Sequence, residues 1–468
     1  MTIPLTVALM TYNRSHYLKQ AIQGILDQTY RNFEFLILDN HSTDDTPAVV
    51  LGCDDPRIRY VRNAPGHRSA FNGTSAMQIA RGARLIITHD DDIMMPTMLE
   101  KQMAIMDEHP DMMAVWVNTD VIDETGRLVQ RYFVSKGNDR IYKRGEYIAR
   151  YPSERLLPIP SGLMLDRNRT PRLLFGDAFY YGRKNLSKGN TSTHGGDDII
   201  FPALLNIRGP VAFLNEPLLQ YRRHSVQDSN DVDISKPVLK THQVLHRLLR
   251  KYASKIPDSA RTEPLLSNYV LRYETQHEVV NTSGMIGRRA QTKLAKWLAQ
   301  GMENVGKSPE AVYPILPLLI LLSQHGMDAE ALFSGLPQPT PAQPSDFRAS
   351  YQWAMLRKGG GNLFASLPEG ANIAILGSAL IAALLVNEAK ARGLGVVCMD
   401  SKPSRQNREM LGVPIHAPEW LKSQGDGINY AILSSERDQE DYLRPFILGL
   451  NKQVKVLSWK ELADGLTP

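Results

Sequence analysis

The chain has 468 residues and a mass of 52.5 kDa, with 43% apolar residues, 22% charged residues and a net charge of +5. A single core rarely grows beyond about 300 residues, so we expect two or three domains, and this composition excludes a disordered or fibrous chain. Its two cysteines, Cys53 and Cys398, lie far apart in the sequence. This excludes a disulfide framework and favours a reducing compartment.

We read no segment of the chain as a signal peptide or a membrane span. The first residues lack the basic region and the small-residue cleavage site of export signals. The longest apolar run, residues 311–322, contains Pro314 and Pro317 and is shorter than the ~20 residues that a bilayer crossing needs. We therefore expect a buried helix there and a cytoplasmic protein.

Three regions differ in their hydrophobic pattern. Residues 1–230 alternate apolar runs with amphipathic stretches, which predicts an α/β domain on a largely parallel sheet. Residues 231–365 read as helices followed by a Pro- and Gly-rich linker. Residues 366–468 return to the strand–helix alternation of a second, smaller Rossmann-like α/β domain.

Positive charge is concentrated in the helical middle region. Residues 236–296 hold 12 Lys or Arg and 4 Asp or Glu, a local charge of +8, so the remaining chain sums to −3. Such a stretch is either a solvated surface or a face that contacts phosphates or an anionic bilayer. Nucleic acid is not an expected partner, because no basic motif with interleaved aromatic residues is present.

Polar residues follow the first two apolar runs, where each predicted strand ends. Thr11, Tyr12 and Asn13 follow one strand, and Asp39 and Asn40 close the next. Ligands of open α/β sheets bind beyond the carboxyl ends of the strands, so these side chains should meet at one rim. Turn and helix-cap roles explain the Ser and Thr residues that come next, but not a carboxylate that closes an apolar strand.

Three consecutive carboxylates, Asp90, Asp91 and Asp92, follow the third apolar run. Adjacent like charges repel, and a divalent cation among them would relieve that repulsion. Carboxylate oxygens suit Mg²⁺ or Mn²⁺, which commonly bridge protein carboxylates and phosphate oxygens. An acidic loop alone is weak evidence, but its position at the end of a third strand favours Mn²⁺ or Mg²⁺ as a cofactor.

The ordered motifs of the first 230 residues resemble glycosyltransferase family 2, whose members adopt the GT-A fold. The motifs are Thr11-Tyr-Asn-Arg14, Gln28-Thr-Tyr30, Asp39-Asn-His-Ser-Thr-Asp44, Phe71-Asn72, Asp90-Asp-Asp92 with Pro96, Gly196-Asp-Asp198 and Tyr221-Arg-Arg-His224. No single motif decides the matter, whereas their order and spacing are specific. The resemblance implies a metal-dependent, inverting transfer of a sugar from a nucleotide-diphosphate sugar to a hydroxyl acceptor.

The resemblance also assigns residues to the donor nucleotide, for which a UDP-sugar is favoured. It places around the base, ribose and pyrophosphate the residues Thr11, Tyr12, Asn13, Arg14, Asp39, Arg68, Asn72 and Asp90. The chain departs from the family at Asn40, where a second Asp is usual. This departure bears on base or ribose contacts more than on catalysis.

The metal signature of the family falls on the Asp triplet in either of two registers. In the first, which the residues after the triplet favour, Asp91 is the metal ligand, Asp90 lies near the ribose, and His89 stands where the family has an acid. In the second register, Asp92 is the ligand. His224 matches the family's C-terminal histidine, which coordinates the metal or contacts the leaving diphosphate.

An acceptor hydroxyl must lose its proton as it attacks, and a positioned carboxylate is the expected general base. Asp197 and Asp198 precede a predicted helix, so one acid can cap that helix while the other faces the sugar. By the resemblance, the second acid of the pair is the base, which points to Asp198 with Asp197 in reserve. A direct displacement with such a base inverts the anomeric centre.

The last region offers a second class of function. Residues 371–400 read as strand, turn, helix and strand, ending at Asp400. The turn has the first Gly of a dinucleotide fingerprint, but Ala379 replaces the middle Gly, whose missing side chain allows close approach to pyrophosphate. An NAD(P)-binding oxidoreductase or a nucleotide-sensing module is therefore an alternative, and a role in interaction or stability is the plainer interpretation.

A third alternative is an inactive scaffold that binds a nucleotide sugar, although Asp91, Asp198 and His224 argue against it. The acceptor could be a glycan, a lipid-linked saccharide or a protein, in the synthesis of cell-surface polysaccharide or glycoconjugates. The basic stretch favours an acceptor presented at the cytoplasmic face of a membrane, with the enzyme peripheral. The two appended regions make self-association a reasonable expectation.

Overall fold

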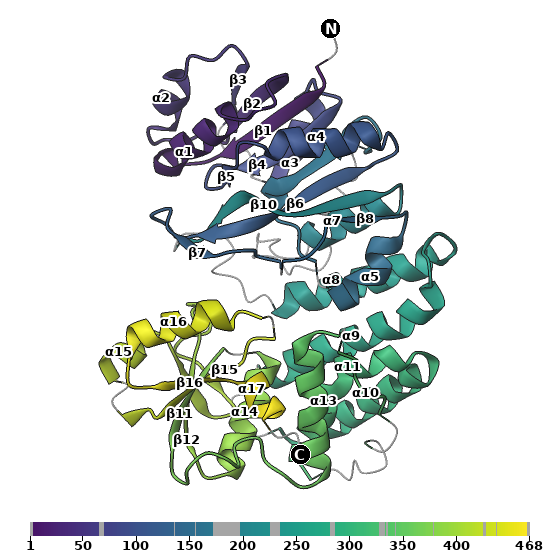
Figure 1. Ribbon diagram of the computed structural model, residues 1–468, viewed down its shortest axis with the longest axis vertical. Helices are drawn as coiled ribbons and strands as arrows, with labels where there is room; N and C mark the ends of the chain where they lie inside the picture. The colour runs from purple at the N-terminus through teal and green to yellow at the C-terminus, as the bar shows by residue number, and fades with distance from the viewer. Residues whose placement is uncertain are drawn as a thin grey trace. The chain divides into compact units, whose positions relative to one another are not determined.

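The computed structural model describes residues 3–64, 70–134, 136–154, 156–171, 197–224, 235–280, 286–326, 333, 336–341, 343–377, 379–424, 427–436 and 438–465. The chain divides into two compact units (Figure 1). The first comprises Met1–Gln227 and Arg247–Pro257, and the second comprises Asp228–His246 and Asp258–Pro468. The predicted domains 1–230, 231–365 and 366–468 stay predictions.

The first unit is an α/β domain. Its elements in chain order are β1 (Leu5–Thr11), α1 (Ser15–Leu26), β2 (Phe33–Asp39), α2 (Thr46–Leu51), β3 (Ile58–Arg62), α3 (Ala70–Ile79), β4 (Arg84–His89), β5 (Ile93–Met94), α4 (Met98–Glu108), β6 (Ala114–Ile122), β7 (Leu128–Gln130), β8 (Arg140–Tyr142), α5 (Glu146–Glu154), η1 (Pro160–Gly162), β9 (Leu163–Asp166), α7 (Asp197–Asn206) and β10 (Val211–Arg222). The strands expected from the first three apolar runs are confirmed as β1, β2 and β4.

Strand β3 was not predicted, so the Asp triplet follows the fourth strand in chain order rather than the third. The sequence of β3 alternates apolar residues with Arg59 and Arg62, and it lies half-exposed at the end of the described sheet. β1 and β2 are buried along almost their whole length, which is why they read as continuous apolar runs. An edge strand lacks that signal.

The strand order of the first sheet is β3-β2-β1-β4-β9-β6-β10-β5, with β7 paired to β6 and β8 to β10. Strands β3, β2, β1 and β4 are parallel. β9 is antiparallel to both β4 and β6, and β10 is parallel to β6. The carboxyl ends of β1, β2, β4, β6 and β10 therefore lie at the same edge of the sheet. Helix α1 packs on this sheet through Leu18, Ala21, Ile22 and Ile25, which recur at helical spacing.

Strand β10 begins at Val211 and has 12 residues. It continues to Arg222 past Pro217, where its register against β6 shifts. Proline has no N–H to donate to a sheet, which explains the irregularity at that point. Near its end, β10 pairs antiparallel with β5, with Leu219 opposite Met94. This pairing holds the end of β10 next to the segment that carries the Asp triplet.

The second unit combines helices with a second sheet. After α8 (Ser235–Lys251) and η2 (Ala253–Lys255), its elements are α9 (Ser259–Val280), α10 (Arg288–Lys307), η3 (Pro309–Ala311), α11 (Val312–Gln324), α13 (Ser345–Lys358), β11 (Asn372–Leu376), α14 (Leu380–Ala391), β12 (Gly395–Met399), β13 (Glu409–Met410), β14 (Val413–His416), α15 (Trp420–Gln424), β15 (Tyr430–Leu433), α16 (Glu440–Leu450), β16 (Lys455–Ser458) and α17 (Trp459–Asp464). The sheet order is β13-β14-β12-β11-β15-β16, with all pairs parallel except β13 with β14. This is the Rossmann-like α/β arrangement that the sequence predicts.

The helices and the second sheet share one hydrophobic core. A single buried cluster includes Leu316 of α11, Trp353 of α13, Leu385 of α14 and Trp459 of α17. Every residue of α11 from Val312 to Leu322 is buried, which confirms the buried helix predicted there. None of the helices in the described part of the chain has both the length and the apolar character required to cross a membrane.

Candidate active site

The sheet brings the Asp triplet to the end of β10. Strand β4 ends at His89, the three carboxylates follow, and β5 then pairs with β10. His224 comes two residues after the end of β10. As a result, His224 contacts Asp91, although the two residues are 133 positions apart in the sequence.

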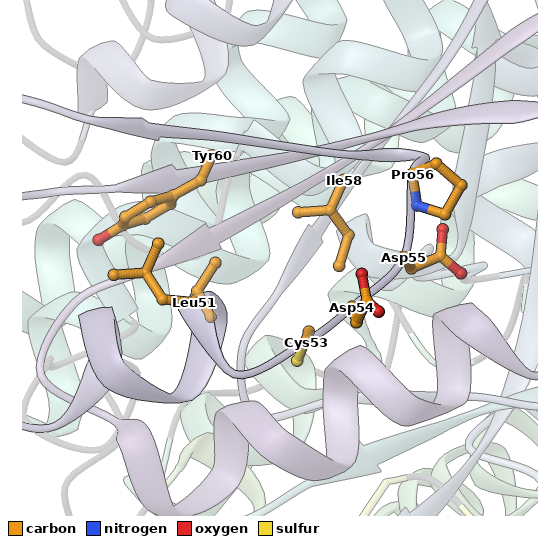
Figure 2. A pocket seen from close by; sticks show the side chains of 8 residues that line it. Leu51, Cys53, Asp54, Asp55, Pro56, Ile58 and Tyr60 are labelled. Carbon is orange, nitrogen blue, oxygen red and sulfur yellow. The ribbon is translucent and has the colours of Figure 1, made fainter.

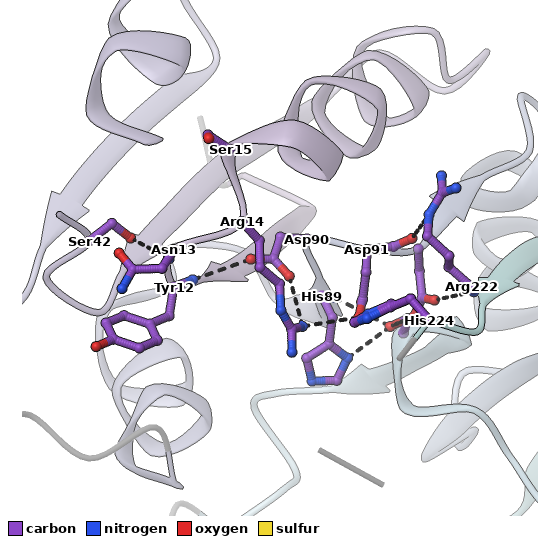
Figure 3. Close-up of polar contacts among 12 residues, drawn as sticks. Tyr12, Asn13, Arg14, Ser15, Ser42, His89, Asp90, Asp91, Arg222 and His224 are labelled. Atoms are coloured by element: carbon purple, nitrogen blue, oxygen red, sulfur yellow. Dashed lines mark hydrogen bonds and ion pairs between the residues drawn. The ribbon is translucent and has the colours of Figure 1, made fainter. Parts of the chain in front are cut away.

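Asp91 is shared between two basic side chains (Figure 3). Its Oδ2 atom lies 3.0 Å from Nε2 of His224 and 3.0 Å from Nη1 of Arg14. Asp91 and His224 are buried, whereas the Arg14 side chain is 22% exposed. Burial raises the pKa of Asp91, but the His224 hydrogen bond and the charges of His89 and Arg14 outweigh it, so the net pKa is lowered. The ionised carboxylate of Asp91 is therefore the negative centre of the site.

Asp90 binds the same arginine and the backbone that follows β1. Its Oδ1 atom lies 3.3 Å from Arg14 Nη1, and its Oδ2 atom accepts a 3.2 Å hydrogen bond from the backbone N–H of Tyr12. Burial and the neighbouring charge of Asp91 raise the pKa of Asp90 to about 6. Arg14 thus bridges two carboxylates and connects the start of α1 to the end of β4.

Asp92 is engaged by the protein on both oxygens. Its Oδ2 atom accepts a 2.5 Å hydrogen bond from the Ser161 hydroxyl, and its Oδ1 atom accepts the backbone N–H of Arg222 at 3.1 Å. The Ser161 oxygen also lies 3.0 Å from Nδ1 of His89. Burial and the charge of Asp91 raise the pKa of Asp92 well above its ordinary value. This arrangement favours Asp91 over Asp92 as the carboxylate that meets a ligand.

Two residues of this cluster, Ser161 and Arg222, were not among the predicted site residues. Ser161 lies in η1, and no feature of the sequence marked it as a site residue. Arg222 belongs to the Tyr221–His224 motif, which was the available signal. The buried Arg222 side chain donates to the Asp91 carbonyl at 3.0 Å and to Gln20 Oε1 at 2.6 Å. It therefore fixes the backbone on which Asp91 stands.

The ends of β1 and β2 are joined by side chains, as the rim prediction implied. Asn13 accepts the backbone N–H of Thr43 at 2.7 Å, and its own N–H donates to Ser42 Oγ at 2.9 Å. Asn13 has a φ of 50°, in the left-handed region that Asn tolerates better than most residues. The Thr11 side chain is buried, whereas Tyr12 is 54% exposed and presents its ring at this rim.

Asp39 lies at its predicted place at the end of β2, but it is fully buried. Its Oδ2 atom accepts the Tyr60 hydroxyl at 2.6 Å, and its Oδ1 atom accepts the backbone N–H of Ser42 at 2.8 Å. Nε of Arg62 lies 3.5 Å from Oδ2. A nucleobase that binds Asp39 would therefore have to share the carboxylate oxygens of Asp39 with Tyr60, Ser42 and Arg62.

A hollow of about 300 Å³ opens beside Tyr60 (Figure 2). It is lined by Val50, Leu51, Cys53, Asp54, Asp55, Pro56, Ile58 and Tyr60. Tyr60 connects this hollow to Asp39 through its hydroxyl, but none of the lining residues belongs to the Asp90–His224 cluster. We therefore do not assign the donor diphosphate to it.

Asp91 and His224 are the two side chains of this cluster that would hold a divalent cation. A carboxylate oxygen and an imidazole nitrogen are both ligands that such a cation takes, and here the two atoms lie within hydrogen-bond distance, 3.0 Å apart. No group of three or more His, Cys, Asp or Glu residues suited to a metal occurs among the described residues. The pair fits a cation that takes its remaining ligands from phosphate and water.

The predicted general base lies at the start of α7. Asp198 is partly buried, and this burial raises its pKa to about 6. Burial, the neighbouring tyrosines and the charge of Asp198 raise the pKa of Tyr147, which places Asp198 beside α5. Asp197 begins α7, but its side chain is outside the described part of the structure, as is that of Asn72 in α3. Arg68 also lies outside the described residues.

The dinucleotide-like turn of the second sheet follows β11. Gly377 has a φ of 116°, and a Cβ atom there would lie 2.4 Å from Ser434 Oγ, so a glycine is required. Asp400 follows β12, as predicted, and its Oδ1 atom accepts the backbone N–H of Lys402. These contacts show that the turn is tight, but they contain no feature specific for a dinucleotide.

The first unit therefore has a parallel-rich α/β sheet with an acidic and basic cluster at its carboxyl edge. Residues 6–167 match the family model described as Glycosyl transferase family 2. An uncharacterized glycosyltransferase of Methanocaldococcus jannaschii is 30% identical over 155 residues, which cover 32% of this chain and 53% of that protein. The UDP-Glc:alpha-D-GlcNAc-diphosphoundecaprenol beta-1,3-glucosyltransferase WfgD of Escherichia coli is 32% identical over 101 residues, which cover 22% and 40%.

Residues 6–167 are thus a glycosyl transferase family 2 domain. The match spans about half or less of the length of these curated relatives. Among solved structures, S. aureus TarS matches with a TM-score of 0.42 and 13% identity, over 76% of this chain and 53% of that chain.

Proposed function

We propose that the first unit transfers a sugar from a nucleotide-diphosphate sugar to a hydroxyl acceptor with inversion at the anomeric carbon. The observation that carries this proposal is the convergence of Arg14, Asp90, Asp91 and His224 at the carboxyl edge of the sheet, within a family 2 domain. Ligands of open α/β sheets bind beyond this edge. A cluster of alternating charge there suits a diphosphate and its counter-ion.

On the donor side, Thr11, Tyr12, Asn13 and Asp39 would surround the nucleoside, and Tyr12 offers an exposed ring for stacking on the base. Asp91 and His224 would hold Mn²⁺ or Mg²⁺ with Asp90 beside them, while Asp92 supports the segment. When bound, the cation would neutralise the charge that develops on the leaving diphosphate. Arg14 would add a second positive charge at the same place.

On the acceptor side, Asp198 would take the proton of the attacking hydroxyl. Its raised pKa suits this role, because a base with a pKa near the working pH is ionised and still accepts a proton readily. Asp197 stays in reserve for this role. The bond from the acceptor oxygen to the anomeric carbon forms as the bond to the diphosphate oxygen breaks, so one displacement inverts the centre.

The acceptor class that we propose is a lipid-linked saccharide at the cytoplasmic face of a membrane. The name of WfgD gives it a diphosphoundecaprenol-linked acceptor and a UDP-glucose donor. The exposed basic residues of 236–296, a set that excludes the buried Arg272, support the same idea, since they would be attracted to anionic headgroups. A UDP-sugar donor, peripheral membrane contact and a role in surface glycan synthesis are all parts of this proposal.

A thermal-shift panel tests the proposal. UDP, GDP, dTDP, CMP and NAD would each be added to the full chain with and without Mn²⁺, because a ligand that binds only the native state raises the melting temperature. We expect one nucleoside diphosphate to stabilise the protein, and to do so more strongly with Mn²⁺. If NAD alone stabilises it, the chemistry lies in the second unit and the proposal fails.

A further inference from the structure

The guanidinium of Arg14 occupies the carboxylate oxygens for which a divalent cation would compete. Nη1 contacts Oδ2 of Asp91 at 3.0 Å and Oδ1 of Asp90 at 3.3 Å. The Asp91 oxygen is also the one that His224 contacts at 3.0 Å. The same Asp91 oxygen therefore binds Arg14 and is also the atom that would bind the metal together with His224.

A divalent cation bound to Asp91 and His224 would share Oδ2 of Asp91 with the guanidinium of Arg14. The two positive charges would repel each other, and a carboxylate oxygen has few lone pairs to offer them both. The Arg14 side chain can move away from Asp91, because Arg14 directly precedes α1 and its side chain is 22% exposed. Asp91 and His224 cannot leave as easily, since both are buried and the Asp91 carbonyl accepts a hydrogen bond from Arg222.

We propose that Arg14 is an exchangeable counter-ion: it pairs with Asp90 and Asp91 in the free enzyme and moves to the donor diphosphate when a divalent cation binds Asp91. This inference rests on the proposed function, because it assumes a diphosphate donor. The planar guanidinium binds phosphate oxygens with two parallel hydrogen bonds, so the group released from one anion finds a suitable partner in the other.

The exchange has a thermodynamic consequence. In the free enzyme, Arg14 competes with the cation, so the metal alone binds weakly. Bound diphosphate attracts Arg14 away from Asp91, so nucleotide and metal strengthen each other's binding by the same factor. The metal would therefore enter together with the donor rather than ahead of it.

The experiment compares Mn²⁺ binding by the wild-type chain and by Arg14→Ala, measured by titration calorimetry without nucleotide. Removing a charge-assisted hydrogen bond that competes for Asp91 should tighten Mn²⁺ binding about tenfold. In the presence of Mn²⁺, the same variant should bind UDP more weakly. These opposite changes in affinity indicate exchange. If Arg14 only held the two acids in position, its removal would weaken the binding of both Mn²⁺ and UDP.

Matched variants keep the test decisive. Arg14→Gln also removes the charge and replaces the Ala variant if that one fails to fold, whereas Arg14→Lys keeps the charge and should leave the affinity for Mn²⁺ alone near that of the wild type. Arg57→Ala removes an arginine of similar exposure, paired with Asp55 at 2.8 Å, and should change neither affinity. An Arg14→Ala or Arg14→Gln variant whose affinity for Mn²⁺ is unchanged or lower overturns the proposal. Absence of UDP, GDP or dTDP binding by the wild type would instead reject the proposed function.

Discussion

Ser161 and Asp92, which are 69 positions apart, are joined by a 2.5 Å hydrogen bond inside the first unit. Both side chains are buried. The serine oxygen also accepts the backbone N–H of His89 at 3.3 Å and lies 3.0 Å from Nδ1 of the His89 ring. A hydroxyl can donate one hydrogen bond and accept two, so with Nδ1 protonated these three contacts use the full capacity of Ser161. The turn before β9 thereby holds the end of β4 in place.

We expect Ser161→Ala to lower stability and to misplace the acidic segment. Losing a hydrogen bond to a buried carboxylate should cost about 1–3 kcal/mol of unfolding free energy, measured by urea titration. Ser308→Ala is the matched control, because Ser308 is also buried and its hydroxyl has no hydrogen-bond partner among the described residues. Equal losses in the two variants would contradict a specific role for Ser161.

The two registers of the Asp triplet make different predictions for Asp91→Asn and Asp92→Asn. If Asp91 is the metal ligand, Asp91→Asn should remove the extra stabilisation that Mn²⁺ gives with UDP, measured as a difference in melting temperature. Asp92→Asn should lower the melting temperature without ligand, because one of its two contacts is lost, yet keep the Mn²⁺ increment. The reverse pattern would show that the second register is right.

The sequence predicted the parts of the site that lie at the ends of apolar strands. Asp39 and Asp91 could be located because buried strands leave a strong periodic signal and their polar ends share one edge. His224 was assigned by the resemblance of the Tyr221–His224 motif to the family. Gln28 was marked in another way, by a family motif after α1, and in the fold its side chain joins this end of α1 to the segment after β5 through Met95 and Leu99.

The parts that could not be predicted depend on packing between distant segments. Ser161 meets Asp92 only because β9 inserts between β4 and β6, and nothing local in residues 152–171 indicates that insertion. Strand β3 was not predicted because it is half-exposed and two of its five residues are arginines, so it forms no continuous apolar run. Arg14 and His224 contact the same Asp91 oxygen only because the tertiary fold brings them together, so the spacing of these residues in the sequence could not predict it.

Asp198 should give the transfer reaction an acidic limb in its pH profile. Its pKa of about 6, raised by burial from 3.8, means that the base becomes protonated below about pH 6, and turnover should fall there. Asp198→Asn should lower turnover by about 10²–10⁴-fold, the usual contribution of a general base, while UDP binding is kept. The exposed Asp111→Asn is the control. Wild-type turnover in Asp198→Asn would remove Asp198 from this role.

The same raised pKa makes a prediction about stability. The folded state holds the Asp198 proton more tightly than the unfolded state, so ionisation costs stability as the pH rises from about 4 through 6. The Asn variant does not ionise and should gain stability relative to the wild type across that window. Melting curves at pH 4, 5, 6 and 7 would show it, and a constant difference between the two proteins would contradict the burial of Asp198.

Glu388 of α14 should be a principal contributor to the stability of the second unit. It is fully buried and accepts hydrogen bonds from Trp353 Nε1 at 3.1 Å, Gln324 Nε2 at 3.0 Å and the backbone N–H of Leu363 at 3.2 Å. These donors come from α13, from α11 and from the segment before β11. Glu388→Ala would leave them buried without an acceptor, at a cost of about 2–5 kcal/mol in unfolding free energy, whereas the exposed Glu303→Ala on α10 should cost under about 0.5 kcal/mol. If urea titration finds both variants equally stable, the helices and the second sheet are held together by apolar packing alone.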